Sequence, residues 1–440
     1  MRFITTTAVA AALALRIAVG AEAASTPQFA MAPPESLGFD PAKLKTLDDA
    51  MDHAVDGGEV AGIEIMAVRH GKIADLHLYG NKHMDADPVT RDTIFRMYSQ
   101  TKPMAGVGMM VLYEKGLWTL DDPITKFIPE FANLKVIGPN GPDGKPTLVD
   151  MVRPPTMREL MTHTAGFGYG LRTGNPVDDM FRDKKVLSSH SLKEMIDKIA
   201  TIPLLYQPGT RWSYSIAADI QGFLIEKLSG QTFGQFMQQN VWGPLKMTDT
   251  GFMVPPENGA RLSGVFVLNP QTQKPFELTN TLFPDLQDFT KPPALESGGG
   301  GSVSTVDDYG RFCQMILNNG ELDGVRMLKP GTVALMEENQ IEASVQPQDG
   351  NSGIPTIGSD AIGFGLDFAV IRDPAKLGSK QGAGSVWWGG AAGTWFWIDP
   401  KNDLFFLGMI QRFGGGSAGS VRLGLQSQRL FYDALTDPSK

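Results

Sequence analysis

The sequence predicts an α+β fold in which one antiparallel sheet, built from both ends of the chain, is flanked by helices and joined to a mainly helical region. Three observations predict this class. A strand–turn–strand pattern lies near the N-terminus, strand patterns and a last helix lie near the C-terminus, and helical patterns fill the middle of the 440 residues. This order is typical of a sheet that is completed from both ends. We expect an α/β part over about 39–98 and 300–440, and a helical and loop part over about 99–299.

The N-terminal part begins with a helix over about 42–55, which Gly57-Gly58 closes. The stretches 62–69 and 73–80 are strand-like and are separated by a short turn, so they predict a hairpin. The apolar run 107–115 then predicts a buried helix.

The remainder of the chain is divided by the same criteria. Residues 120–155 are rich in turn formers. Residues 251–296 have the composition of an elaborated loop, which we expect to cover one face and shape a cleft. The expected helices lie at 156–161, 192–202, 215–230, 234–241, 304–318 and 420–435, and the expected strands at 361–371, 385–398 and 404–411.

The first 24 residues have the pattern of a signal peptide. Arg2 precedes the apolar segment 8–19, and Ala21-Glu22-Ala23-Ala24 resembles a cleavage site. Arg16 is an atypical interruption of the apolar segment, and a helical or disordered N-terminal tail is the alternative. We expect an exported protein, periplasmic or secreted, whose mature domain spans 25–440.

Composition excludes several classes of protein. The chain is 42% hydrophobic and 20% charged, as expected of an ordinary globular protein. A net charge of -9 argues against a nucleic-acid partner, which requires a basic face. No later stretch is apolar and long enough to span a bilayer. Cys313 is the only cysteine, which excludes an intramolecular disulfide and a cysteine-based zinc site. The oligomeric state is left open.

Ser99 and Lys102 are the first candidate catalytic pair. They lie three residues apart at the expected start of the 107–115 helix, so their side chains share one face. A serine hydroxyl is a poor nucleophile until a base removes its proton, and a desolvated lysine can act as that base. An N-cap serine followed by a surface lysine is the alternative interpretation, and context has to decide.

Acyl transfer from such a serine also needs a second proton carrier and donors for the oxyanion. Tyr214, just before the expected 215–230 helix, is a candidate carrier, although an aromatic packed at a turn explains it equally well. The run Trp388-Gly389-Gly390-Ala391 precedes the aromatic stretch 395–398. Its small residues would let a substrate lie along a strand, with a backbone N–H directed at the oxyanion; a bulge in a buried strand is the alternative.

Other motifs point to no separate chemistry. Ser417 lies in Gly415-Gly416-Ser417-Ala418-Gly419, which matches a nucleophile elbow, but no histidine follows it in the chain as that mechanism requires. His77 and His83 fit solvated hairpin residues better than a metal site, and 298–301 lacks the Gly-Lys-Ser/Thr of a phosphate loop, so tight backbone packing explains it. We expect neither a metal nor a cofactor.

Four stretches in this order resemble the serine β-lactamase/penicillin-binding-protein superfamily, within it the class C-like branch and most closely the family VIII carboxylesterases. They are Ser99-Gln100-Thr101-Lys102, residues 160–166, Pro208-Gly209-Thr210-Arg211-Trp212-Ser213-Tyr214-Ser215, and residues 299–305. The resemblance covers about 40–435 and implies a β-lactamase/transpeptidase-like serine hydrolase fold. It implies that Ser99 is acylated and that Lys102 and Tyr214 act as general base and acid. It also implies an oxyanion hole formed by the N–H groups of Ser99 and Ala391.

Two departures from the family pattern bear on the substrate. Tyr214-Ser215-Ile216 replaces Tyr-x-Asn, and Trp388-Gly389-Gly390 replaces Lys-Thr-Gly, so the amide and the cation that hold a β-lactam are missing. Tyr79-Gly80-Asn81 matches Tyr-x-Asn literally but precedes Ser99, whereas the tyrosine of the family follows the nucleophile. Arg172-Thr173-Gly174 resembles Lys-Thr-Gly but lies before Tyr214 and outside a strand pattern. Losing a charge-assisted contact of about 1.5–3 kcal/mol weakens such substrates roughly 10- to 100-fold.

The sequence therefore favours a serine carboxylesterase that acts on small neutral short-acyl or aryl esters, with a small-molecule ester as its partner. A β-lactamase, D,D-peptidase or transesterase acting on β-lactams or cell-wall peptides keeps the same mechanism and is the first alternative. A binding protein without activity on the same fold is the second. It is disfavoured because Ser99, Lys102 and Tyr214 are all present.

Overall fold

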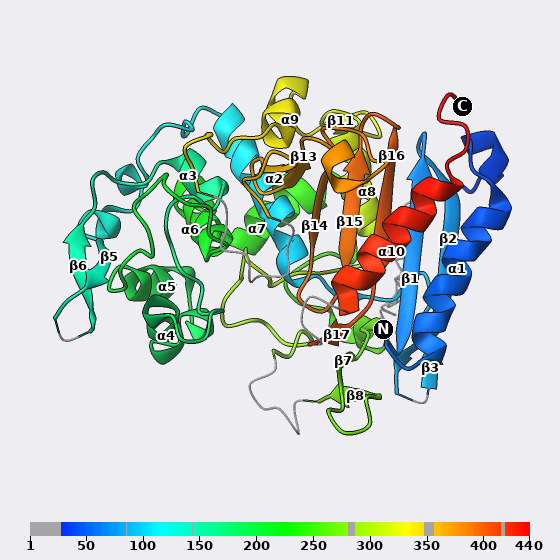
Figure 1. Cartoon of the computed structure of the whole chain (residues 1–440), viewed down its shortest axis with the longest axis horizontal. Coiled ribbons are helices and arrows are strands. Elements are labelled where there is room, and N and C mark those ends of the chain that lie inside the picture. The colour runs from blue at the N-terminus through cyan, green and yellow to red at the C-terminus, as the bar shows by residue number, and fades with distance from the viewer. Residues whose placement is uncertain (1–27, 85, 143, 280–286, 347–355, 415–418) are drawn as a thin grey trace, which may run out of the picture.

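The computed structural model describes residues 28–84, 86–142, 144–279, 287–346, 356–414 and 419–440 (Figure 1). The expected signal peptide over 1–24 and the Ser417 motif lie outside the described residues. A large sheet with helices on both faces stands beside a mainly helical region (Figure 1). Within the described part, no helix is both long and apolar enough to cross a membrane.

The main sheet has eight strands in the order β12-β13-β14-β15-β16-β1-β2-β3. Every neighbouring pair is antiparallel, and Glu64 of β1 stands opposite Met409 of β16, which joins the two ends of the chain. The strands are β1 (Gly62–Arg69), β2 (Lys72–His83), β3 (Ala86–Pro88), β12 (Ile362–Phe364), β13 (Ala369–Ile371), β14 (Val386–Gly389), β15 (Trp395–Asp399) and β16 (Leu404–Met409). The predicted fold class is confirmed.

The prediction of single strands over 361–371 and 385–398 was wrong. Each range is a hairpin, formed by β12 with β13 and by β14 with β15. The second hairpin turns at Gly390–Thr394, where the Gly390 N–H donates to the Thr394 carbonyl and the Gly393 N–H to the Gly390 carbonyl. A run of small residues between two aromatic strands therefore marks a turn.

Helices cover both faces of the sheet. On one face lie α1 (Pro41–Asp56) and α10 (Gly419–Ala434), and on the other lies α8 (Val306–Leu317) (Figure 1). Because the centre of the sheet is covered on both sides, all eight residues of β1 are buried. Helix α1 begins where the side chain of Asp40 accepts the N–H of Ala42, and it buries an apolar stripe at helical spacing.

The second region is built from α2 (Thr101–Glu114), α3 (Met157–Met161), α4 (Pro176–Asp183), α5 (Leu192–Ile199), α6 (Ala217–Ser229) and α7 (Phe233–Met237), while α9 (Pro330–Glu337) packs nearby. Small sheets complete it: β4 (Phe95–Arg96) with β9 (Val303–Ser304), β5 (Lys135–Asn140) with β6 (Pro146–Asp150), β10 (Glu321–Leu322) with β11 (Val325–Arg326), and β7 (Val265–Leu268) between β8 (Pro275–Leu278) and β17 (Arg412–Phe413).

The sequence prediction missed several of these elements. Residues 120–155 were expected to be loop but contain the β5–β6 hairpin, most of which is exposed and so lacks the alternation of buried and exposed residues that marks a strand. Residues 251–296 contain β7 and β8 as well as loop. The short helices α4 and α9 were not predicted either.

Candidate active site

Ser99 lies in a 3-10 turn, Tyr98–Gln100, that leads directly into α2. The preceding residue, Tyr98, has a φ of 44°, a left-handed conformation that bulky residues rarely adopt. The ring of Tyr98 is held edge-on by Phe289 and Phe413, which stabilises this turn. A strained residue next to a candidate nucleophile is a feature of functional sites. Ser99 is thereby presented at the first turn of the helix, where backbone N–H groups have no partner within the helix.

Lys102 lies one turn further along α2 and is almost completely buried, with 1% of its surface exposed. Its Nζ is 3.3 Å from Ser99 Oγ, 3.2 Å from the hydroxyl of Tyr169 and 2.6 Å from the carbonyl oxygen of Gly299. These three oxygens fix the amine beside the serine. The predicted contact between Ser99 and Lys102 is therefore present in the structure.

Tyr214 reaches the serine from the other side. Its hydroxyl donates to Ser99 Oγ at 2.7 Å, and Lys102 Nζ lies 4.6 Å from the centre of its ring. The ring packs against His163, Trp212 and Trp388, so its direction is set by surrounding aromatics. The structure brings together all three residues of the predicted catalytic centre.

Tyr169 is a member of this group that sequence reasoning missed. Its hydroxyl lies 3.2 Å from Lys102 Nζ, and its ring meets that of Tyr214 edge-on at 5.5 Å. Burial, together with the nearby carboxylate of Asp219, raises the pKa of Tyr169 well above its usual value. Tyr169 therefore stays protonated. Its sequence context, Phe167-Gly168-Tyr169-Gly170, contains no motif that could have identified it.

Two buried carboxyl groups face the charge of Lys102. Asp219, in the first turn of α6, accepts the Ser297 hydroxyl and the Gly299 N–H. Asp367 accepts the amide of Gln221 and lies so close to Gly106 of α2 that a Cβ there would be 2.7 Å from Asp367 Oδ2. Burial raises the pKa of both groups, to about 8 for Asp367, although Lys102 opposes the shift.

His163 is the one histidine buried beside the centre. Burial, and secondarily the charge of Lys102, lowers its pKa well below the usual value, so its imidazole is neutral. Its Nδ1 lies 2.9 Å from the hydroxyl of Ser215. A neutral ring whose centre lies 5.0 Å from that of Tyr214 packs against the tyrosine and adds no charge beside it.

The β14–β15 turn completes the site because Gly390 lets it approach the backbone before Ser99. A Cβ on Gly390 would lie 2.4 Å from the Met97 carbonyl and 2.3 Å from Thr394 Oγ1, which leaves no room for a side chain. A Cβ on Gly299 would similarly meet Asp219 and Tyr169 at 2.2 and 2.4 Å. The glycine run 298–301 is thus explained by close backbone packing, as predicted. The close approach of Gly390 to Met97 agrees with the place of Gly389, Gly390 and Ala391 in the lining of the same cavity as Ser99.

The cavity around Ser99 has a volume of about 640 Å³. The predicted residues Ser99, Tyr214, Trp388, Gly389, Gly390 and Ala391 all line it, while Lys102 lies buried behind it. None of the described lining residues has a charged side chain. Trp388, where the related pattern has a lysine, packs its ring against Tyr214 and Phe364. The 251–296 region contributes Gln287 and Leu295 to the wall, in agreement with its predicted role in shaping a cleft.

The two motifs that lie at the wrong places in the family order, 79–81 and 172–174, contribute no residue to the cavity lining. Tyr79 is on β2, where its hydroxyl donates to Asp56 at 3.0 Å, and Arg172 pairs with Asp178 in a loop. His77 and His83 are partly buried rather than solvated, and hydrogen bonds join them to Asp52 and Glu277.

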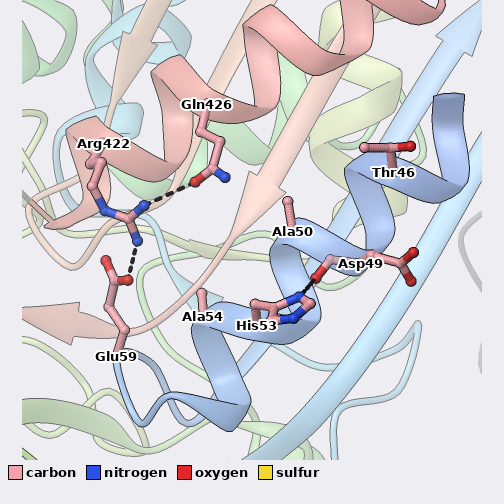
Figure 2. Close-up of a pocket in the computed structure, with 8 residues that line it drawn as sticks. All are labelled: Thr46, Asp49, Ala50, His53, Ala54, Glu59, Arg422 and Gln426. Atoms are coloured by element: carbon pink, nitrogen blue, oxygen red, sulfur yellow. Dashed lines mark hydrogen bonds and ion pairs between the residues drawn. The ribbon is translucent and has the colours of Figure 1, made fainter.

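A second hollow of about 420 Å³ lies between α1 and α10 (Figure 2). Its polar side chains are engaged locally. Arg422 contacts Glu59 and donates to Gln426 at 2.9 Å, and His53 bonds to the backbone of Asp49 (Figure 2). None of the predicted site residues lines this hollow.

The fold and the contacts among Ser99, Lys102 and Tyr214 agree with a serine hydrolase of the β-lactamase fold, and the family comparison agrees. The model of the β-lactamase family matches residues 47–428, and the chain belongs to this family.

Three known proteins illustrate the range of its relatives. Protein Rv1367c of Mycobacterium tuberculosis is 33% identical over 81% of this chain and 87% of its own length. Esterase EstB of Burkholderia gladioli is 31% identical over 89% of this chain and 97% of its own length. The solved structure of EstCE1, a hydrolase with promiscuous acyltransferase activity, has a TM-score of 0.73 and 24% identity, and covers 92% of this chain and 99% of its own.

Proposed function

We propose that this protein is a serine hydrolase that cleaves neutral carboxylic esters through an acyl-enzyme on Ser99. The observation that carries the proposal is the Ser99–Lys102–Tyr214 cluster at the wall of a cavity with no charged side chain among its described lining residues. The similarity to Esterase EstB supports the reaction class.

The geometry supports a two-step mechanism. Lys102, whose Nζ is within reach of Ser99 Oγ, takes the serine proton as the oxygen bonds to the ester carbonyl carbon. The N–H groups of Ser99 and Ala391 are the proposed donors to the resulting oxyanion. Tyr214 then gives its hydroxyl proton to the alkoxide as the C–O bond breaks and the alcohol leaves, and the proton held on Lys102 restores the tyrosine hydroxyl. Water attacks the acyl-enzyme with the same groups as base and acid, which releases the carboxylic acid.

The uncharged lining favours esters over β-lactams and cell-wall peptides. Those substrates carry a carboxylate next to the reacting carbonyl, and burying an ion without a partner is costly. Trp388 occupies the place of the expected cation and is itself packed against aromatics. A small neutral ester, short-acyl or aryl, meets no such penalty at Ser99.

The first test is the nucleophile itself. Ser99→Ala should abolish both labelling by a fluorophosphonate probe and hydrolysis of 4-nitrophenyl acetate, because only Ser99 Oγ is placed between Lys102 and Tyr214. Ser439→Ala, at an exposed serine near the C-terminus, is the matched control and should behave like the wild type. Turnover by Ser99→Ala at near the wild-type rate would refute the proposal.

The second test is the substrate class. The wild-type kcat/KM for 4-nitrophenyl acetate should exceed that for nitrocefin, a carboxylated lactam. A strong preference for nitrocefin would instead show a β-lactamase.

A further inference from the structure

The cavity at Ser99 is larger than a small ester requires. An apolar cavity of about 150 Å³ holds one benzene ring, so the 640 Å³ here has room for roughly four. The proposed centre occupies one end. The other end is lined by Gly424, Leu425 and Gln428 of α10, a helix that contributes nothing to the Ser99–Lys102–Tyr214 contacts.

The end at α10, which we term the outer arm, begins beyond the β14–β15 turn. Trp388 faces Tyr214 at a ring distance of 5.6 Å. Trp387, one residue earlier, is the cross-strand neighbour of Trp397, whose ring packs against Phe431 and Tyr432 of α10. The cavity therefore extends from the face of β14 that is next to Tyr214 to the face that is next to α10, around the small residues of the turn. Figure 1 shows the start of α10 close to the same end of β14 and β15.

The wall of the outer arm is largely apolar, although Gln428 belongs to it, and part of it is exposed. Leu425 of α10 and Leu377, on the segment between β13 and β14, are 54% and 40% exposed although both line the cavity. Ile371 and Trp387 line the same cavity. Exposed leucines that line one largely apolar cavity indicate a binding surface for an apolar group.

The position of the proton carrier decides which part of an ester the outer arm receives. A departing alkoxide must lie next to Tyr214 to accept its proton, so the alcohol part occupies the tyrosine side. The acyl part is the other substituent of the attacked carbonyl and extends past the turn.

We propose that the outer arm is an acyl-binding subsite and that the preferred substrates are neutral esters of long or aryl-substituted apolar acids. This inference rests on the proposed function, and it replaces the short acyl chains favoured by the sequence with bulkier ones.

The test compares two substrates that share a leaving group, 4-nitrophenyl acetate and 4-nitrophenyl 6-phenylhexanoate. The wild-type kcat/KM should be at least about 10-fold higher for the phenylhexanoate, because its acyl group gains apolar contact that the acetyl group lacks. In Leu425→Glu and Leu377→Glu this ratio should fall about 10-fold, since a carboxylate then faces the acyl chain. Leu148→Glu, at a leucine of β6 that is 57% exposed and outside the cavity lining, should keep the wild-type ratio within about twofold.

The outcomes separate this inference from the proposed function. A wild type that hydrolyses the acetate but does not prefer the phenylhexanoate overturns the acyl subsite alone. Folded Leu425→Glu and Leu377→Glu variants whose ratio of kcat/KM values matches that of Leu148→Glu overturn it as well. If Leu425→Glu instead slows only the hydrolysis of 4-phenylphenyl acetate, an ester with a bulky alcohol part, the outer arm receives the alcohol. Its assignment to the acyl part is then wrong. A wild type with no turnover of any ester and no fluorophosphonate labelling refutes the proposed function itself. If neither arm variant folds, the wild-type ratio decides.

Discussion

Replacing Gly390 by alanine tests whether the β14–β15 turn positions the reacting groups. The added Cβ would lie 2.4 Å from the Met97 carbonyl oxygen and 2.3 Å from Thr394 Oγ1. Ordinary contacts of this kind are about 1 Å longer, so the turn has to move away from the Ser99 backbone by an amount of that order. A displacement of about 1 Å costs roughly 100-fold in rate, and losing one oxyanion donor costs roughly 100- to 1,000-fold. We expect kcat/KM for 4-nitrophenyl acetate to fall at least 100-fold.

The assay has to separate misplacement of the turn from unfolding. Steady-state kinetics are therefore measured beside the thermal midpoint and the rate of fluorophosphonate labelling, which should fall in parallel with kcat/KM. Gly331→Ala in α9 is the control, because nothing lies within 4 Å of the Cβ it would add. It should leave kinetics unchanged. A Gly390→Ala enzyme within about threefold of the wild type refutes the assigned role of the turn.

Two further predictions concern the buried groups around Lys102. Tyr169→Phe removes a hydroxyl 3.2 Å from Lys102 Nζ, and kcat should fall about 10- to 100-fold with a changed pH–rate profile; an unchanged kcat and profile would show that Tyr169 only packs. The pKa of Asp367 is raised to about 8, so its contribution to folding is complete below about pH 4 and is lost as the pH rises toward 8. Asp367→Asn should therefore flatten the decline in the free energy of unfolding between pH 5 and 8, as urea titrations measure it, and an identical pH dependence in both proteins would contradict the raised pKa.

The sequence was most informative where the decisive relationship is local. Three residues separate Ser99 from Lys102, and helix geometry alone places both side chains on one face. The glycine run 298–301 likewise predicted close backbone packing from its composition alone. Tyr214 could be preferred to a packing residue only through the resemblance to a family, because it lies 115 positions after Ser99 and no local pattern connects the two.

The parts that sequence reasoning missed depend on distant contacts. Tyr169 and Asp367 come from loops far from α2, and only the folded chain places them around Lys102. The hairpin β14–β15 was interpreted as one strand because aromatic residues on both sides of the turn give a continuous apolar stretch. The outer arm was missed for the same reason, because the cavity extends from Trp388 to α10 around the β14–β15 turn.

The pairing of β1 with β16 has a consequence for how the chain folds. We expect β1 to pair early with its hairpin partner β2, because their contacts are local, whereas the other edge of β1 has no partner until β16 is available. Contacts between residues so distant in sequence form slowly and leave apolar strand edges exposed in the meantime. We therefore expect refolding from urea to be limited by the pairing of β16 with β1. A circular permutant that begins at Pro330 and joins the original chain ends would shorten the stretch of sequence between β16 and β1, and it should fold faster with the same sheet order.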